Sequence, residues 1–114
     1  MAKLVWLDDL RRQRSFVHFT RPELNQLLQL YSRRVAIGEW RDYAIHHDNL
    51  RARFMVFRNR LAGPIFTIVK LAPAGDGKTA YLVASGIRPL KRGASLAEVL
   101  AIFERKLTLV SSSI

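Results

Sequence analysis

The chain has 114 residues, of which 49% are hydrophobic and 25% are charged, which is the composition of one folded globular domain and not of a disordered segment. It contains no cysteine, which excludes a disulfide framework and cysteine-ligated zinc. No apolar run is long enough to cross a bilayer. Near the N-terminus, acids and then arginines follow a very short apolar patch, the opposite of a secretory signal, and we expect a cytoplasmic protein.

Charge is the strongest signal in the composition. Lysine and arginine number 19 against 9 acids, which gives a net charge of +10, and the excess is spread over both halves of the chain. Most of the bases are arginine, which makes planar two-point contacts with phosphate and carboxylate groups. A surface this basic favours an acidic partner, such as nucleic acid, anionic lipid or an acidic protein.

The N-terminal part of the chain predicts an arm followed by a short strand. Residues 1–14 are expected to be the arm, whose apolar side chains could dock on the domain or on a partner. Residues 15–19 alternate Phe16 and His18 with Val17 and Phe19, which is the pattern of a strand.

A helix is predicted to begin after Thr20. Thr20 and Glu23 have the spacing of a capping box, and Pro22 suits the first turn, where its missing N–H costs nothing. Apolar residues recur at steps of three and four over residues 24–35, and Gly38 is suited to ending the helix.

A period of two in residues 40–46, and then a stretch that is apolar on both faces and one that is β-branched and apolar, predict a series of strands. The first three cover residues 40–46, 52–59 and 65–71, with turns rich in Asn, Asp, Gly and Pro between them. A further strand is predicted over residues 79–86, and residues 87–93 extend or end it.

A second helix is predicted after Ser95, which has the spacing of a capping box with Glu98 and is followed by an apolar face. Residues 107–110 are expected to close the core or to add an edge strand.

Residues 72–79, APAGDGKT, match the loose form of the phosphate-binding loop. Such a loop needs a helix that opens directly from it. The residues that follow, up to Gly86, leave no room for a helix of useful length. We therefore interpret the stretch as the loop of a β-hairpin, with Asp76-Gly77 as its turn.

These elements, in the order β-α-β-β-β-β-α, predict a single α+β domain over residues 15–110. An antiparallel meander of four to five strands is expected to hold both helices on one face, and its other face could be open to a partner. Residues 111–114 are expected to be a flexible tail.

The stretches HFTRPEL and GEWRDYAI, with FRNRLAGPIFTIVK and RPLKRGASLAEVLAIFERK after them, resemble domain-of-unknown-function family 2794, a family of short alphaproteobacterial proteins. The resemblance covers residues 15–110. It implies a bacterial, cytoplasmic, single-domain protein and carries over no activity and no site.

Helix, antiparallel meander and helix in this order are also similar to a double-stranded-RNA-binding domain, which places a Gly-Pro loop in the minor groove. Gly63-Pro64 lies between two predicted strands, and Lys91-Arg92 precedes the second helix. The lysine run usual in that helix is missing here, and the extra strand also departs from the pattern.

Neither a metal site nor a catalytic group is predicted. His46 and His47 are neighbours, and neighbouring side chains on a strand point to opposite faces. Glu23 and Glu98 are explained by capping boxes, and no serine has the surroundings of a nucleophile elbow. We expect no cofactor and a protein that is not an enzyme.

The basic residues are the candidates for binding, and further arginines flank the 52–59 strand in RAR and RNR. Trp40, beside Arg41, could stack a base, or it could pack the start of a strand against the preceding helix. The candidate contacts are Arg11, Arg12, Arg14, Arg33, Arg34, Trp40, Arg41, Arg58, Arg60, Lys91 and Arg92.

Two functions follow from this set. We expect a small non-enzymatic protein that binds nucleic acid, RNA or DNA, through an arginine-rich surface, with contacts to the phosphate backbone dominating. The alternative is an adaptor or accessory subunit whose basic surface meets an acidic protein partner within a larger complex. The oligomeric state is left open.

Overall fold

The computed structural model describes residues 16–59 and 61–112, with the side chains of the last helix described up to Glu104. The expected arm, residues 1–14, lies outside this part. In chain order the elements are helix α2 (Arg21–Ala36), strands β1 (Asp42–His47), β2 (Arg51–Phe57), β3 (Phe66–Leu71), β4 (Tyr81–Ser85) and β5 (Arg88–Gly93), and helix α3 (Leu96–Ser112).

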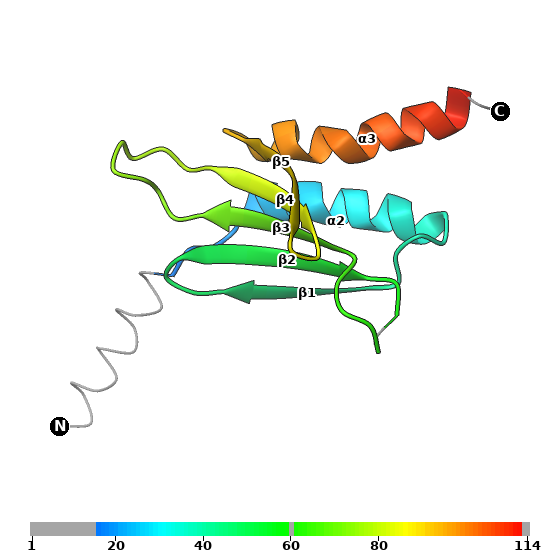
Figure 1. Ribbon diagram of the computed structural model, residues 1–114, viewed down its shortest axis with the longest axis horizontal. Coiled ribbons are helices and arrows are strands. Elements are labelled where there is room, and N and C mark those ends of the chain that lie inside the picture. The colour runs from blue at the N-terminus through cyan, green and yellow to red at the C-terminus, as the bar shows by residue number, and fades with distance from the viewer. Residues whose placement is uncertain (1–15, 60, 113–114) are drawn as a thin grey trace.

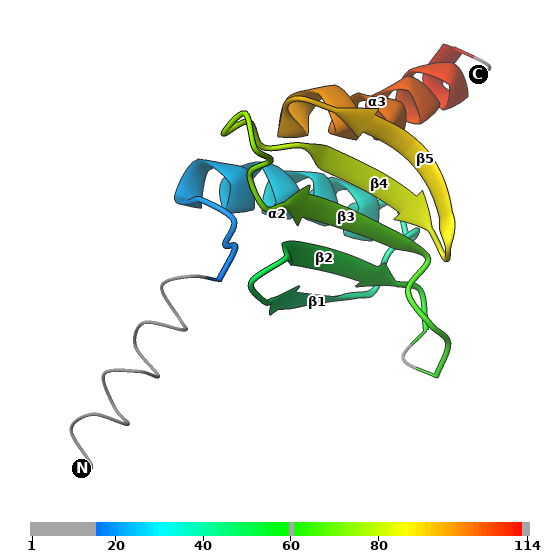
Figure 2. The same cartoon turned by 60° about the vertical axis from the view of Figure 1, so that its left-hand side comes forward.

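The five strands form one antiparallel sheet in the order β1-β2-β3-β4-β5, so each strand pairs with its neighbours in the chain. Both helices lie on the same side of the sheet (Figure 1). Figure 2 turns the opposite side toward the viewer, and no helix of the described chain crosses it. The predicted α+β meander with both helices on one face is confirmed.

The strand predicted over residues 15–19 is wrong. Residues 17–20 belong to no strand, and the Val17 N–H donates to the Asp48 carbonyl at 2.8 Å, at the turn between β1 and β2. This segment leads into α2 without joining the sheet, so among the described residues the order of elements begins with a helix.

The C-terminal half differs from the expectation in two places. Residues 87–93 do not extend β4, because Gly86, at a φ of 60°, turns the chain back and β5 pairs antiparallel with β4. Residues 107–110 belong to α3, which continues through Ser112 and so includes the first two residues of the expected tail.

The ends of α2 are as predicted. The Glu23 N–H donates to Thr20 Oγ1 at 3.3 Å, and the Thr20 N–H donates to Glu23 Oε1 at 2.7 Å, which completes the capping box. After the helix, Gly38 has a φ of 79° and its N–H donates to the Val35 carbonyl at 3.0 Å.

The core lies between the helices and the face of the sheet that they cover. Its buried side chains include Leu27 and Leu30 of α2, Phe54, Val56, Ile68 and Val83 of the strands, and Val99 and Phe103 of α3. Because successive side chains of a strand point to opposite faces, the alternate residues of each strand point to the uncovered side.

The APAGDGKT stretch is the loop between β3 and β4, as predicted. Gly77 has a φ of 76° and donates its N–H to the Ala74 carbonyl at 2.8 Å, while the Lys78 N–H donates to Asp76 Oδ1 at 2.9 Å. Strand β4 follows directly, where a phosphate-binding loop would need a helix.

Glu23 connects the start of α2 to the middle of the sheet. Its carboxylate accepts hydrogen bonds from Lys70 Nζ at 2.8 Å and from the Tyr81 hydroxyl, besides the capping bond from the Thr20 N–H. Burial acts to raise the pKa of Glu23, but these hydrogen bonds outweigh it and lower the pKa below the usual 4.5. Burial and the contact with Glu23 raise the pKa of Tyr81 to about 12.

We expect Glu23→Gln to destabilise the protein by about 2 kcal/mol at neutral pH, because Lys70 loses its counter-ion in a site where the two side chains are 14% and 12% exposed. The folded pKa of Glu23 lies below its unfolded value, so the stability that the carboxylate contributes is lost as the pH falls from 4.5 through the folded pKa. Denaturant unfolding should therefore show a difference between wild type and variant that shrinks on acidification. A difference independent of pH would contradict this.

Candidate functional site

The basic residues singled out in the sequence do not share one face. Arg11, Arg12, Arg14 and Arg60 lie outside the described residues. The others occupy three surface places and the interior: Arg33 on α2, Arg41 and Arg58 where β1 begins and β2 ends, Lys91 and Arg92 on β5, and Arg34 and Trp40 in the interior.

Arg34 is a structural residue, which corrects its assignment as a surface contact. It is 3% exposed, and its guanidinium forms an ion pair with Glu39 and donates to the Phe103 carbonyl of α3. The guanidinium also lies 5.9 Å and 5.7 Å from the ring centroids of Trp40 and Phe103. These contacts hold the end of α2 against α3, where no surface partner reaches Arg34.

Trp40 is also removed from the candidate surface. It is 2% exposed, and its ring lies 6.4 Å from Tyr31, 6.2 Å from Phe66 and 5.4 Å from Phe103, centroid to centroid. It therefore packs the start of β1 against the helices, which is the second of the two roles considered for it in the sequence, and it is too buried to stack a base.

Arg41 and Arg58 are brought together across the β1–β2 pair. They line an open hollow of about 380 Å³ with Asp42 and Asn59. Asp42 places an opposite charge beside them, so the hollow is less basic than the two arginines alone would make it.

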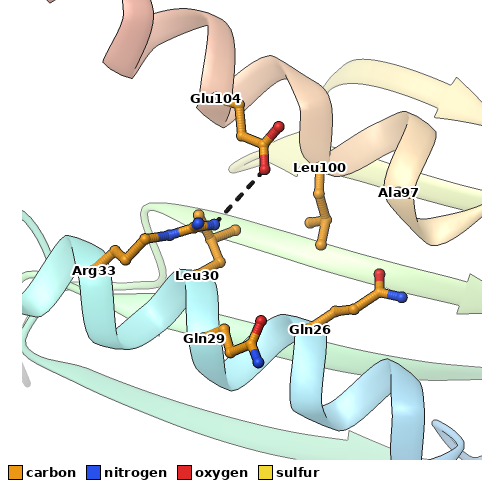
Figure 3. Close-up of a pocket in the computed structure, with 7 residues that line it drawn as sticks. All are labelled: Gln26, Gln29, Leu30, Arg33, Ala97, Leu100 and Glu104. Carbon is orange, nitrogen blue, oxygen red and sulfur yellow. Dashed lines mark ion pairs between the residues drawn. The ribbon is translucent and has the colours of Figure 1, made fainter. Parts of the chain in front are cut away.

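Arg33 lies at a groove between the helices, with a volume of about 260 Å³. Figure 3 shows Gln26, Gln29 and Arg33 of α2 facing Leu100 and Glu104 of α3. Arg33 forms an ion pair with Glu104 at 3.7 Å across the groove. These two charges balance, so the groove has little to attract a phosphate group.

The uncovered side of the sheet, which we call the open face, is the more informative surface. The pairing of the strands shows which residues form it: Asp42, Ala44 and His46 of β1, Arg51, Arg53, Met55 and Phe57 of β2, Thr67, Val69 and Leu71 of β3, Leu82 and Ala84 of β4, and Pro89 and Arg92 of β5. It is the side turned toward the viewer in Figure 2.

Arginines lie on the open face on both sides of the central strand β3. Arg51 and Arg53 stand on β2, and Arg92 stands on the edge strand β5. Asp42 is the one acid among the described strand residues of this face. The open face is therefore basic, although it contains only Arg92 of the candidates from the sequence.

One row of residues crosses all five strands of this face, from His46 through Arg53, Val69 and Leu82 to Arg92. Neighbouring strands are about 4.8 Å apart, so the two arginines are separated by roughly 14 Å. A guanidinium nitrogen of Arg53 lies 2.9 Å from His46 Nδ1, and Arg53 Nε is buried without a hydrogen-bond partner among the described atoms.

Val69 and Leu82 lie between Arg53 and Arg92, and further apolar side chains of the open face lie beside them. Met55, Phe57, Leu71 and Leu82 are half-buried and Val69 is 5% exposed, although no helix of the described chain lies over them. A flat apolar surface bordered by arginines can bind a ligand that has both planar rings and negative charge.

A sequence signal for this face was present in β2. The residues RARFMVF alternate strictly, with Arg51, Arg53, Met55 and Phe57 on one side. The predicted strand began at residue 52, and RAR was counted only as its basic flank, so the arginines that share a face with Phe57 were missed.

Other kinds of site find no support in the described part of the chain. Across residues 16–59 and 61–104, no three His, Asp or Glu side chains come together as a group that could hold a metal ion. No helix of that part is long and apolar enough to cross a membrane.

A comparison with models of protein families matches residues 17–100 to a family described as protein of unknown function, DUF2794. The chain belongs to this family. The match confirms the resemblance seen in the sequence over a somewhat shorter span, and it includes the whole sheet and open face of this DUF2794 protein. No match was found among curated proteins or among solved structures.

Neighbouring arginines of α2 offer a test of the roles assigned here. We expect Arg34→Ala to lower the free energy of unfolding by about 2–4 kcal/mol, because it leaves a cavity and removes the bond to α3. Arg33→Ala should change it by less than about 0.5 kcal/mol, because the Arg33 side chain is 55% exposed and its ion pair is solvated. Denaturant unfolding of both variants measures the difference, and equal effects would contradict the assignment.

Proposed function

We propose that this DUF2794 protein binds single-stranded nucleic acid across the open face of its sheet. The observation that carries the proposal is the presence, on one uncovered face, of Phe57 and Met55 together with Arg51, Arg53 and Arg92. Aromatic side chains on an open sheet stack unpaired bases, and nearby arginines meet the phosphates. The net charge of +10 adds long-range attraction for a polyanion.

The shape of the molecule favours an unpaired strand over a duplex. A duplex is commonly read by a helix placed in its major groove. Here the side of α2 that lines the two hollows presents the neutral Asn25, Gln26, Gln29 and Ser32, and the one base in that lining, Arg33, is paired with Glu104. A flat sheet face, by contrast, gives unpaired bases a surface to lie on.

A second observation at Arg53 supports a phosphate contact there. Among the described atoms its buried Nε has no hydrogen-bond partner, which costs about 1–3 kcal/mol. A small rotation of the guanidinium toward a phosphate oxygen would satisfy this nitrogen and add a charge-assisted hydrogen bond.

We expect Arg53→Gln/Arg92→Gln to weaken binding to a single-stranded oligonucleotide at least about tenfold. The slope of log affinity against log salt should fall by about 1.4, because each phosphate contact on a single strand contributes about 0.7. Fluorescence anisotropy titrations at several salt concentrations measure both quantities.

The matched control is Arg21→Gln/Arg33→Gln, which removes the same amount of charge from two exposed positions of α2. Equal losses in the two double variants would show that only net charge matters and would contradict a site on the open face. Binding that vanishes by physiological salt, equally for every polymer and for heparin, would favour the alternative in which the basic surface meets an acidic protein partner.

A substitution of Phe57 distinguishes stacking of bases from general electrostatic attraction of a polyanion. We expect Phe57→Leu to reduce affinity for single strands by about 1 kcal/mol and to leave duplex binding unchanged, because leucine keeps the apolar volume and removes the aromatic face. Anisotropy with a single strand and with its duplex gives the comparison, and an unfolding curve verifies that the variant is folded. An equal effect on both ligands would count against stacking at this position.

A further inference from the structure

The two edges of the sheet are built differently. Strand β5 contains Pro89, which has no N–H to offer, and the bases Arg88, Lys91 and Arg92, and the register shifts opposite Val83 and Ala84. Proline, positive charges and bulges are the means by which proteins prevent an edge strand from pairing with another chain.

Strand β1 has none of these protections. Its sequence, DYAIHH, contains no proline, lysine or arginine, and it pairs with β2 in regular register over its whole length. Among the described residues no strand lies on its outer side. An unprotected regular edge of this kind is a template for β-sheet pairing.

The hydrogen bonds of the sheet show which backbone groups β1 leaves open. At the end of the strand, the Asp48 N–H donates to the Arg51 carbonyl at 3.0 Å. Asp48 and Arg51 are therefore a hydrogen-bonded pair of the antiparallel ladder. The next pair along the strands, His47 and Ala52, is then a non-hydrogen-bonded pair. Hydrogen-bonded and non-hydrogen-bonded pairs alternate along the strand. This alternation gives the direction of the backbone N–H and carbonyl groups of the other β1 residues.

By this alternation Ala44 and His46 bond to β2, whereas the N–H and carbonyl groups of Tyr43 and Ile45 point out of the sheet. The Tyr43 N–H donates to the side chain of Asp42 at 2.9 Å, which agrees with an outward direction. The free edge therefore offers donors and acceptors at two alternate residues.

Apolar side chains accompany this edge on the helix side of the sheet. Val35, Tyr43 and Ile45 are 40%, 40% and 43% exposed, and the Tyr31 ring lies 4.8 Å from the Tyr43 ring. Leu28 and Tyr31 are partly buried and precede Val35 on α2 at steps of three and four, which places them on the same side of the helix. We call Leu28, Tyr31, Val35, Tyr43 and Ile45 the edge strip.

We propose that two copies of this chain pair through β1, edge to edge, about a two-fold axis at Ala44. In this register Tyr43 of one copy lies opposite Ile45 of the other, so the outward backbone groups of both meet and exchange hydrogen bonds. Small Ala44 side chains meet at the axis. The Tyr43 N–H exchanges its bond to Asp42 for one to the second copy.

The polar side chains near the ends of β1 agree with this register. Asp42 of one copy faces His46 of the other on the open face, and the symmetry repeats the pair. A second copy therefore offers Asp42 an imidazole N–H donor besides the backbone bonds of β1, while Tyr43 and Ile45 form an apolar pair on the helix side.

The contacts at the end of the strand set the length of the pairing. The His47 ring lies 5.9 Å from Phe16 and 4.3 Å from His18, centroid to centroid, so this end is occupied by the chain itself. Residues 42–46 remain for the second copy. The two edge strips then meet beside the paired strands and bury their exposed apolar side chains.

The pairing also joins the two sheets into one, so that the open faces of both copies form a continuous surface. The inference does not depend on nucleic-acid binding, because it can be tested with the protein alone.

Sedimentation of the full chain over a range of micromolar concentrations provides the first test. We expect a monomer–dimer equilibrium whose dissociation constant rises at least about tenfold in Ile45→Lys. The matched control, Ile87→Lys, makes the same change at an exposed residue of the β4–β5 turn and should leave the equilibrium unchanged. A protein that stays monomeric, or a dimer insensitive to Ile45→Lys, would overturn the proposal.

A single cysteine tests the register, because the chain has none of its own. Two copies of Ala44→Cys should form an intermolecular disulfide rapidly with oxidised glutathione, since directly opposed residues of a non-hydrogen-bonded pair lie about 4.5 Å apart at their Cα atoms. The control Ala84→Cys carries a thiol on the same face, inside the sheet, and should form the disulfide far more slowly. Equal rates would exclude the two-fold axis at Ala44.

Discussion

Helix α2 is fixed over the sheet by a buried charge near each end. At its start Glu23 accepts hydrogen bonds from Lys70 and Tyr81, and near its end Arg34 pairs with Glu39 and bonds to the main chain of α3. Buried charges persist only where partners satisfy them. These contacts therefore leave α2 one position, and the rest of the architecture depends on it.

Both candidate surfaces follow from that position. The helices cover one side of the sheet, so half of the strand side chains form the open face without a helix over them. On the covered side Tyr43 and Ile45 remain 40% and 43% exposed, because the helix layer covers the β1 edge only in part. A small helix layer on a wider sheet thus produces a face and an edge that are both available for binding.

Features decided by neighbouring residues were predictable from the sequence. The capping box at Thr20 and the period-two strands are of this kind. Burial of Arg34 and Trp40 depends on Phe103, far along the chain, so charge and aromatic character alone suggested a surface site. The prediction of a strand over residues 15–19 was wrong for a related reason. A segment with an alternating pattern forms a strand only where it can pair with another strand of the sheet. The alternation in β2 separates arginines from core residues, but which side the helices cover depends on the whole fold.

The order of the strands has a kinetic consequence. Each strand pairs with its neighbour in the chain, so every pair can close as a hairpin with a small loss of chain entropy. The contacts that hold α2 are of another kind: Glu23 is 47 and 58 residues from Lys70 and Tyr81, and Arg34 is 69 residues from Phe103. Contacts between residues so distant form slowly. Loop-closure entropy therefore favours a folding route in which the meander assembles early and the docking of α2 completes the core.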